Sequence, residues 1–179
     1  MLAASCAVPQ QRADASQADR PVLVERSYVP VRQAHREVPR LADFVLVDKS
    51  DRLLVLYSGG EALRAYRGIQ FGDAPMGHKR FQGDERTPEG RYLIDTRNPQ
   101  SSYHLSLRIS YPNQADREFA AAYGQSPGGD IFIHGQPNGL ASNRRMRGDW
   151  TDGCIALSNA EIEEVWQLVP DGTPIEIRP

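Results

Sequence analysis

The chain has 179 residues, of which 40% are hydrophobic and 25% are charged, and 21 basic residues nearly balance 23 acidic ones. A chain of this length is expected to form one folded domain with a substantial core. The net charge of −2, without a block of lysine or arginine, argues against a nucleic-acid partner. No stretch approaches the roughly 18 consecutive apolar residues of a membrane span, so no transmembrane segment is predicted.

The first six residues, with the sequence MLAASC, resemble the end of a bacterial export signal, in which small residues lead to a cysteine. The charged start and longer apolar run of a full signal do not precede them. If this is a lipoprotein signal, Cys6 is the lipidated N-terminus of the mature protein. The alternative is an ordinary terminal segment in which the cysteine is incidental.

Residues 7–40 are polar, contain several prolines and show no sustained apolar period, which is typical of a linker or a loosely held arm. We therefore divide the chain into an N-terminal segment, residues 1–41, and a folded domain, residues 42–179. A disulfide between Cys6 and Cys154 is not expected, because the first lies in the N-terminal segment and the second in a motif suited to chemistry.

The apolar pattern of the folded domain predicts mainly strands. Strands are expected at residues 44–48, 53–57, 62–71, 91–95, 105–110, 131–134, 154–157 and 173–177. A helix is predicted over residues 114–123, and a second over 159–169, where Ser158 and Glu161 form a capping box. The absence of strand–helix–strand alternation indicates a β-dominated α+β fold. His78 lies in the long loop 72–90 and is expected to be exposed to solvent.

The residues best suited to chemistry lie between positions 128 and 157. His134 ends one apolar strand, and Cys154 opens another about twenty residues later, directly after Gly153. If these strands are neighbours, the imidazole could lower the thiol pKa and carry its proton. Gly153 suits a tight turn in which the backbone N–H groups of Gly153 and Cys154 face an oxyanion, and Gly135 would permit a close backbone approach. The alternative is a cysteine packed in the core and a structural histidine.

Other residues are weaker candidates for substrate contacts, among them Thr151 and Asp152, which directly precede Gly153. Guanidinium groups in the loop between histidine and cysteine could bind carboxylates, although such a loop is often simply solvated; these are Arg144, Arg145 and Arg147. Trp150 is expected either to wall the cleft or to pack in the core. Tyr103 and His104 are candidates for lining the site. The alternative for His104 is a structural hydrogen bond. No metal site is predicted, because neither HExxH nor paired-cysteine spacing is present, and no cofactor is expected.

These motifs resemble a known family. The residues His134-Gly135 and Thr151-Asp152-Gly153-Cys154 are similar to the hallmark of the L,D-transpeptidase catalytic domain of the YkuD type. Residues 86–92, RTPEGRY, resemble the family's TPxGxF/Y segment, and residues 44–56 resemble its opening hairpin. The resemblance covers residues 42–179 and implies the YkuD-like fold of mixed β-sheets with a few short helices.

The resemblance implies an enzyme of the periplasm or cell envelope that acts on peptidoglycan stem peptides. Cys154 would attack the carbonyl of diaminopimelate or a similar third residue, expel the terminal D-alanine and hold the peptide as a thioester. His134 would accept and donate the proton. An amine on a neighbouring stem or on an envelope lipoprotein would then take the acyl group, or water would release it. Carbapenems are expected to acylate the same sulfur.

The sequence departs from the family pattern at two positions. Most members read Ser-His-Gly-Cys followed by an apolar residue and arginine, whereas Asp152 and Ala156 stand here for the histidine and the arginine. Asp152 would disfavour a thiolate; the alternative is that it caps the turn or binds a nearby arginine. The Thr-Asp-Gly-Cys-Ile-Ala pattern, with residues 106–113, resembles the YafK-like branch, which is associated with cutting lipoprotein off peptidoglycan. Three functions stay open: crosslinking or remodelling by transpeptidation, hydrolysis that releases lipoprotein or trims stems, and non-catalytic cell-wall binding.

Overall fold

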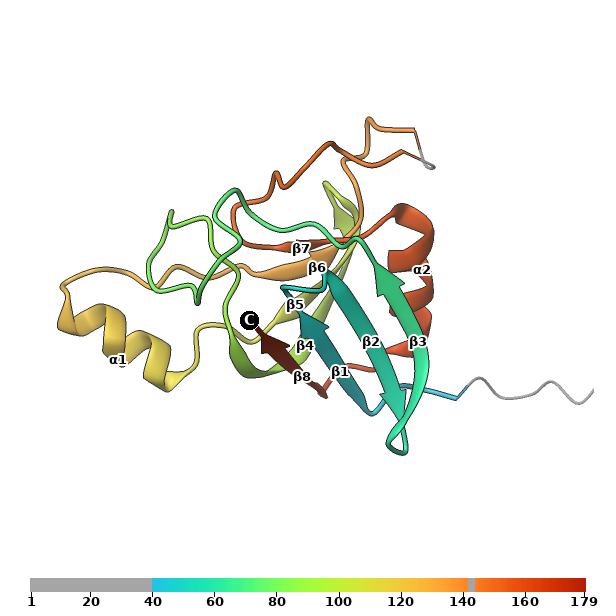
Figure 1. Cartoon of the computed structure of the whole chain (residues 1–179), viewed down its shortest axis with the longest axis horizontal. Coiled ribbons are helices and arrows are strands. Elements are labelled where there is room, and N and C mark those ends of the chain that lie inside the picture. The colour runs from blue at the N-terminus through green and yellow to red at the C-terminus, as the bar shows by residue number, and fades with distance from the viewer. Residues whose placement is uncertain (1–39, 142–143) are drawn as a thin grey trace, which may run out of the picture. The chain divides into compact units, whose positions relative to one another are not determined.

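The computed structural model describes residues 40–141 and 144–179, which form one mixed sheet and two helices (Figure 1). Cys6 and nearly all of the expected N-terminal segment lie outside these residues. The elements are β1 (Phe44–Asp48), β2 (Leu53–Ser58), β3 (Glu61–Arg67), β4 (Gly90–Ser101), β5 (His104–Ile109), α1 (Gln114–Ala122), β6 (Phe132–His134), β7 (Ile155–Ala156), α2 (Asn159–Leu168) and β8 (Thr173–Arg178). Neither described helix has the length and hydropathy needed to cross a bilayer. The β-dominated α+β class is confirmed.

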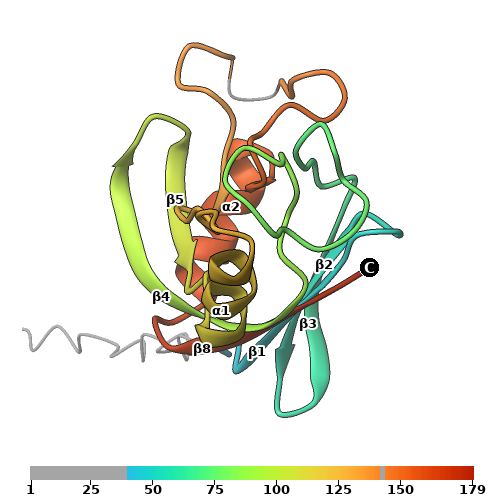
Figure 2. The same ribbon diagram turned by 90° about the vertical axis from the view of Figure 1, so that its left-hand side faces the viewer.

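The eight strands follow the order β3-β2-β1-β8-β4-β5-β6-β7. Neighbours are antiparallel except for β1 with β8 and β6 with β7, which are parallel. The sheet curls, so that β4 and β5 stand on one side and β2 and β3 on the other, with α2 inside the curve (Figure 2). The parallel pair β6–β7 confirms that the two short apolar strands before and after the His–Cys loop are neighbours.

Helix α2 fills the core because its apolar residues recur at helical spacing. Ile162 and Val165 are fully buried among strand residues. Burial of one such side chain contributes roughly 1.5–3 kcal/mol. Ser158 caps the helix through the predicted capping box with Glu161, which satisfies backbone N–H groups that the first turn leaves free. The helix therefore begins at the position that its sequence indicates.

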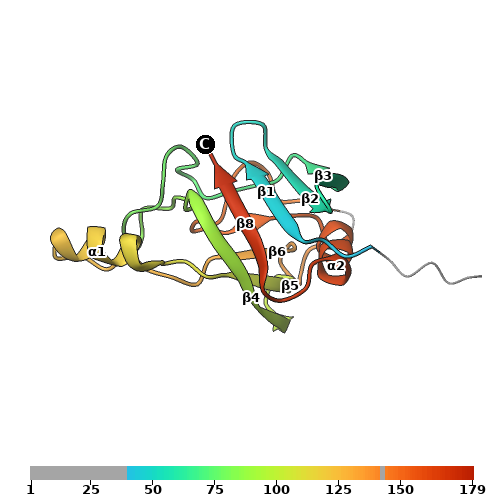
Figure 3. The ribbon, with the colours of Figure 1, turned by 90° about the horizontal axis from the view of Figure 1, so that it is seen from below.

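Helix α1 lies at the other end of the domain from α2 (Figures 1 and 3). Its Asp116 closes a capping box with Asn113 and also accepts a hydrogen bond from His78 Nε2 at 3.0 Å. The other ring nitrogen of His78 accepts the backbone N–H of Glu89 at 2.7 Å. The expectation that His78 is solvent-exposed was wrong: its side chain is 13% exposed, because both ring nitrogens have partners within the fold.

The expected third strand ends earlier than predicted, at Arg67 rather than at residue 71. Gly68 adopts a φ of 68°, and the chain then crosses to the opposite edge of the curled sheet. There Gln70 donates its backbone N–H to the Ala156 carbonyl at 3.0 Å and accepts the Ala156 N–H at 2.8 Å. The crossing segment thus pairs with β7 and closes the curl of the sheet beside Cys154.

The loop 72–90 is fixed by two buried lysines. Lys49 binds Glu89 Oε1 and the Gly77 carbonyl, both at 2.7 Å. Lys79, which is 3% exposed, binds Asp84 at 2.9 Å. Because a buried ammonium group without partners is very unfavourable, these contacts hold the loop in one conformation beside the sheet.

Candidate active site

The turn before β7 presents Cys154 and is anchored from both sides. Gly153 has a φ of 118°, and a Cβ built there would lie 2.4 Å from the carbonyl oxygen of Arg86, so only glycine fits. The Thr87 hydroxyl donates to the Gly153 carbonyl at 2.9 Å. Within the turn, Thr151 Oγ1 donates to the Cys154 carbonyl at 2.8 Å. The Thr-Pro segment of loop 72–90 therefore sets the position of the cysteine.

His134 ends β6, and its imidazole is nearly completely buried, with 3% exposure. Its Nδ1 lies 2.7 Å from the Gly135 carbonyl oxygen. Because a carbonyl oxygen can only accept, Nδ1 carries the hydrogen and Nε2 keeps a free lone pair. Gly135 packs against α2: a Cβ there would lie 2.7 Å from Asn159 Oδ1, which explains the need for glycine beside the histidine.

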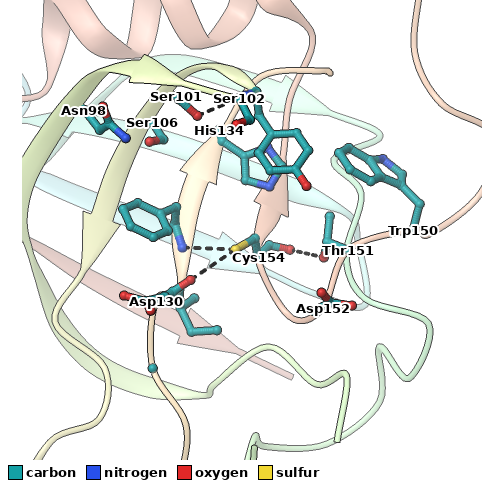
Figure 4. Close-up of a pocket in the computed structure, with 14 residues that line it drawn as sticks. Asn98, Ser101, Ser102, Ser106, Asp130, His134, Trp150, Thr151, Asp152 and Cys154 are labelled. Atoms are coloured by element: carbon teal, nitrogen blue, oxygen red, sulfur yellow. Dashed lines mark hydrogen bonds between the residues drawn. The ribbon is translucent and has the colours of Figure 1, made fainter. Parts of the chain in front are cut away.

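A cavity of about 460 Å³ is lined by both candidate catalytic side chains, Cys154 and His134 (Figure 4). The sulfur of Cys154 accepts the Phe132 N–H at 3.4 Å and donates to the Asp130 carbonyl at 3.5 Å. In the part of the chain that the structure describes, no hydrogen bond joins Cys154 to His134. The cavity is lined by Asn98, Ser101, Ser102, Tyr103, Ser106, Gly129, Asp130, Ile131, Phe132, His134, Trp150, Thr151, Asp152 and Cys154.

Desolvation disfavours the charged forms of both candidate catalytic groups in the free protein. It raises the pKa of Cys154 to about 11, against the opposing Phe132 N–H, and the Asp152 carboxylate raises it further. Burial also lowers the pKa of His134 to about 4, although the Gly135 carbonyl favours the protonated ring. The expected lowering of the thiol pKa by the imidazole does not occur in this state: desolvation dominates, and the unprotonated ring carries no charge that would stabilise a thiolate. At neutral pH the pair is a thiol and an unprotonated imidazole.

Two aromatic side chains enclose the imidazole. The Tyr103 ring stacks on His134 with a centroid distance of 4.6 Å and an interplanar angle of 28°. Trp150 contacts the same ring edge-on at 5.6 Å and 65°. Both rings line the cavity, so of the two expectations for Trp150 the structure places it at the cleft wall. Together they exclude water from most of the imidazole surface.

The remaining predicted residues divide into two groups. Thr151 and Asp152 line the cavity. His104 does not, because its Nε2 binds Glu163 Oε1 at 2.7 Å, the structural role that was the other expectation. The loop arginines are also absent from the described lining. Arg145 binds Glu161 and the Gly68 carbonyl, whereas the other two are exposed to solvent; these are Arg144 and Arg147.

A second cavity of about 680 Å³ adjoins the first on the side of loop 72–90. The two share Gly129, Asp130 and Asp152 in their linings. The second cavity also contains Lys79 and Glu85, so its walls are more polar. The turn that carries the sulfur therefore lies between two spaces, each large enough for part of a peptide.

Three residues that support the site were not among the predicted site residues. Thr87 holds the cysteine turn, as described above. Gln70 and Gln136 are buried and meet through a hydrogen bond of 3.1 Å between their side chains. A signal for the glutamines was available: each is a lone amide within or just after an apolar stretch, and a buried amide requires partners. Among residues 40–141 and 144–179, no cluster of three or more His, Cys, Asp or Glu side chains could hold a metal ion.

Comparison with known proteins establishes the family. Residues 42–177 match the L,D-transpeptidase catalytic domain, YkuD. The chain belongs to the L,D-transpeptidase catalytic domain family. This confirms the predicted fold, while the YafK-like branch stays a prediction. No match to a curated protein is found.

Solved structures that are similar to this chain include Pgp2, the helical cell shape determining protein of Campylobacter jejuni. It aligns with a TM-score of 0.60 and 29% identity over 76% of this chain and 47% of Pgp2. Bd1075 of Bdellovibrio bacteriovorus gives a TM-score of 0.52 and 25% identity over 78% and 51% of the two chains. An L,D-transpeptidase from Mycobacterium smegmatis, 16% identical with a TM-score of 0.50 over 77% and 59%, shares the fold. The chain spans about half the length of Pgp2 and Bd1075.

Proposed function

We propose that this L,D-transpeptidase-family domain is a cysteine acyltransferase acting on peptidoglycan stem peptides, with Cys154 as nucleophile and His134 as general base and acid. The observation that carries the proposal is the pairing of a thiol and an unprotonated Nε2 in one cavity, at the positions of the family motif. We place the reaction in the cell envelope, where peptidoglycan lies. Lipid attachment through Cys6 stays a prediction.

In the acylation step, Nε2 of His134 takes the thiol proton while the sulfur attacks the carbonyl carbon of the stem peptide. The negative charge moves to the carbonyl oxygen. In the free protein the Gly153 N–H donates to Thr151 Oγ1 through a bond of 3.3 Å, which is long and therefore weak. An oxyanion is a stronger acceptor and would take this donor over. The imidazolium then protonates the leaving amine, and a thioester on Cys154 results.

In the second step an acceptor resolves the thioester. Nε2 of His134 removes a proton from the incoming amine, the nitrogen bonds to the carbonyl carbon, and the C–S bond breaks. The sulfur recovers its proton from the imidazolium, so the enzyme returns to its starting state. Water in place of the amine gives hydrolysis by the same sequence. The Nδ1–H bond to the Gly135 carbonyl keeps Nε2 directed at the cavity throughout.

The charges that line the first cavity favour a second candidate function, while the cationic Lys79 lines the adjoining cavity. Among the described residues that line the first cavity, the formally charged side chains are Asp130 and Asp152, and none is cationic. A leaving D-alanine carries a carboxylate, which these two aspartates repel. The side-chain amine of a lipoprotein has no such negative charge to be repelled. This observation favours a hydrolase or amidase that releases lipoprotein from peptidoglycan.

Product analysis with defined muropeptides tests both candidates. Purified protein is incubated with a tetrapeptide stem, with and without an amine acceptor, and with a stem amidated at the third residue by a lysine side chain. Products that contain the amine acceptor support transpeptidation. Release of free stem from the lysine-linked substrate, without any product that contains the acceptor, supports the hydrolase. A carbapenem supplies the covalent test: without a mass increase that depends on Cys154, the domain is a binding module and the proposal fails.

A further inference from the structure

Two buried glutamines connect β6, which ends at His134, to β7, which directly follows Cys154. Gln136 follows His134 by two positions, and Gln70 pairs through its backbone with Ala156, two positions after Cys154. The Gln136 Nε2 group donates to Gln70 Oε1 at 3.1 Å and to the Leu157 carbonyl at 2.7 Å. The contact between the two side-chain amides therefore links β6 to the segment that pairs with β7.

The same two amides hold the end of the His–Cys loop. Gln136 Oε1 accepts the Met146 N–H at 2.9 Å. Gln70 Nε2 donates to the Met146 carbonyl at 2.8 Å and to the Gly148 carbonyl. Gln70 Oε1 accepts the indole N–H of Trp150 at 3.3 Å. Both hydrogens and both acceptor sites of the Gln70 amide are used, so its orientation is fixed and it fixes its partners in turn.

Trp150 is thereby held from two directions. Its backbone N–H donates to the Phe71 carbonyl at 3.0 Å, directly after Gln70, and its indole N–H binds the Gln70 side chain. The indole in this orientation meets the His134 ring edge-on, while Tyr103 covers the face of that ring. An indole released from Gln70 would open the imidazole to water and to reorientation.

We propose that Gln70 and Gln136 are positioning residues for the reaction: Gln70 holds Trp150 against His134 and Gln136 orients Gln70, so that the imidazole stays enclosed and its Nε2 stays directed into the cavity. The inference rests on the proposed function, because it assigns these amides a role in acylation. It goes beyond the fold, because a purely structural amide pair would stabilise the domain without changing the behaviour of the imidazole in the folded protein.

The test compares Gln70→Leu, Trp150→Phe and the double variant, with acylation by a carbapenem followed by mass spectrometry. We expect the first-order acylation rate constant of Gln70→Leu to fall about 10- to 100-fold, the size expected for a misplaced reacting group. In the Trp150→Phe background, which already lacks the indole N–H, Gln70→Leu should cause little further loss. Losses that multiply in the double variant would show that Gln70 does not act through Trp150 and would overturn the proposal.

A second measurement reads the imidazole directly by following its ring protons in NMR through a pH titration. The ionisable groups that share its cavity are Tyr103, Cys154, Asp130 and Asp152, and they are unchanged in Gln70→Leu. Because water gains access to the ring, the His134 midpoint should rise from about 4 toward 6.5. A folded Gln70→Leu protein with the wild-type midpoint and rate constant would overturn the proposal.

Thr173→Val is the matched control. Its buried hydroxyl donates to the Pro170 carbonyl at 2.7 Å in the turn before β8, so the variant loses a hydrogen bond without touching the cavity lining. It should lower stability and leave the rate constant and midpoint unchanged. If Gln70→Leu does not fold, Trp150→Phe serves in its place, because Trp150 is only half-buried. This variant must then raise the midpoint of the His134 titration. A wild-type protein without a carbapenem adduct would refute the proposed function, while the titration would still test the positioning.

Discussion

The burial of His134 predicts a specific loss of stability in acid. The ordinary pKa of histidine, 6.5, applies to the unfolded chain, whereas burial lowers the folded value to about 4. Above the unfolded value both states hold a neutral ring, and the group has no effect. As the pH falls below 6.5 the unfolded state binds a proton that the folded state excludes, so stability declines until the folded pKa is reached. At 1.36 kcal/mol per pH unit, the total loss is about 3 kcal/mol.

The assay is urea unfolding of the wild type and of His134→Asn at about pH 7.5 and about pH 4, followed by circular dichroism. Asparagine retains an N–H donor for the Gly135 carbonyl but cannot titrate. All other ionisable groups are the same in the two proteins, so their contributions cancel in the comparison. The wild type should therefore lose about 3 kcal/mol more than the variant between the two pH values.

Equal losses in the two proteins would refute this reasoning. Such a result would mean that the folded imidazole takes up its proton as readily as the unfolded chain does. The cavity would then admit enough water to solvate the charge, and the picture of an imidazole enclosed by Tyr103 and Trp150 would have to be abandoned. A larger loss in His134→Asn would contradict the sign of the linkage itself.

Three further predictions concern the nucleophile and its turn. Cys154→Ser should eliminate the carbapenem adduct at an almost unchanged urea midpoint, since a hydroxyl lacks the thiol's accessible pKa; an adduct on the variant would place the chemistry elsewhere. Thr87→Val removes the hydroxyl that binds the Gly153 carbonyl, and should cost about 1–2 kcal/mol and slow acylation; an unchanged rate would show that the turn holds itself. Gly153→Ala should lose more stability in urea unfolding than Gly124→Ala. The Cβ of the first variant would lie 2.4 Å from the Arg86 carbonyl oxygen, whereas the Cβ of the second meets open space at a φ of 66°. Equal losses would contradict the steric argument.

Local sequence patterns were sufficient to predict the parts of the fold that depend on near neighbours. The opening hairpin β1–β2 pairs as its turn-forming residues 49–52 indicate. Helix α2 begins at its capping box, and Gly124, with a φ of 66°, follows α1 as expected for a C-terminal glycine. Two short apolar strands that flank a polar loop allowed the adjacency of β6 and β7, which the structure shows.

Features that depend on distant partners could not be predicted in this way. The apolar run 69–71 looks like the continuation of β3, yet it pairs with β7, because β7 is the edge that the curled sheet leaves open. The histidine in loop 72–90 is buried by Asp116 from another element, and Arg145 is bound by Glu161 of α2 rather than by the cavity. The alternation of apolar and polar residues and the helix-capping residues do not predict such pairings. These pairings depend on which segments meet in the folded chain.

The shortness of β7 has a consequence for how the sulfur is placed. A strand of two residues has almost no hydrophobic pattern of its own to fix its register, and a slip by one residue would turn every side chain to the opposite face of the sheet. Such a slip would carry Cys154 away from His134 while leaving the rest of the fold in place. The two backbone bonds between Gln70 and Ala156, with the Leu157 N–H bound to the His134 carbonyl at 2.8 Å, remove that freedom. The face on which the thiol emerges is thus determined by a segment from the first half of the chain.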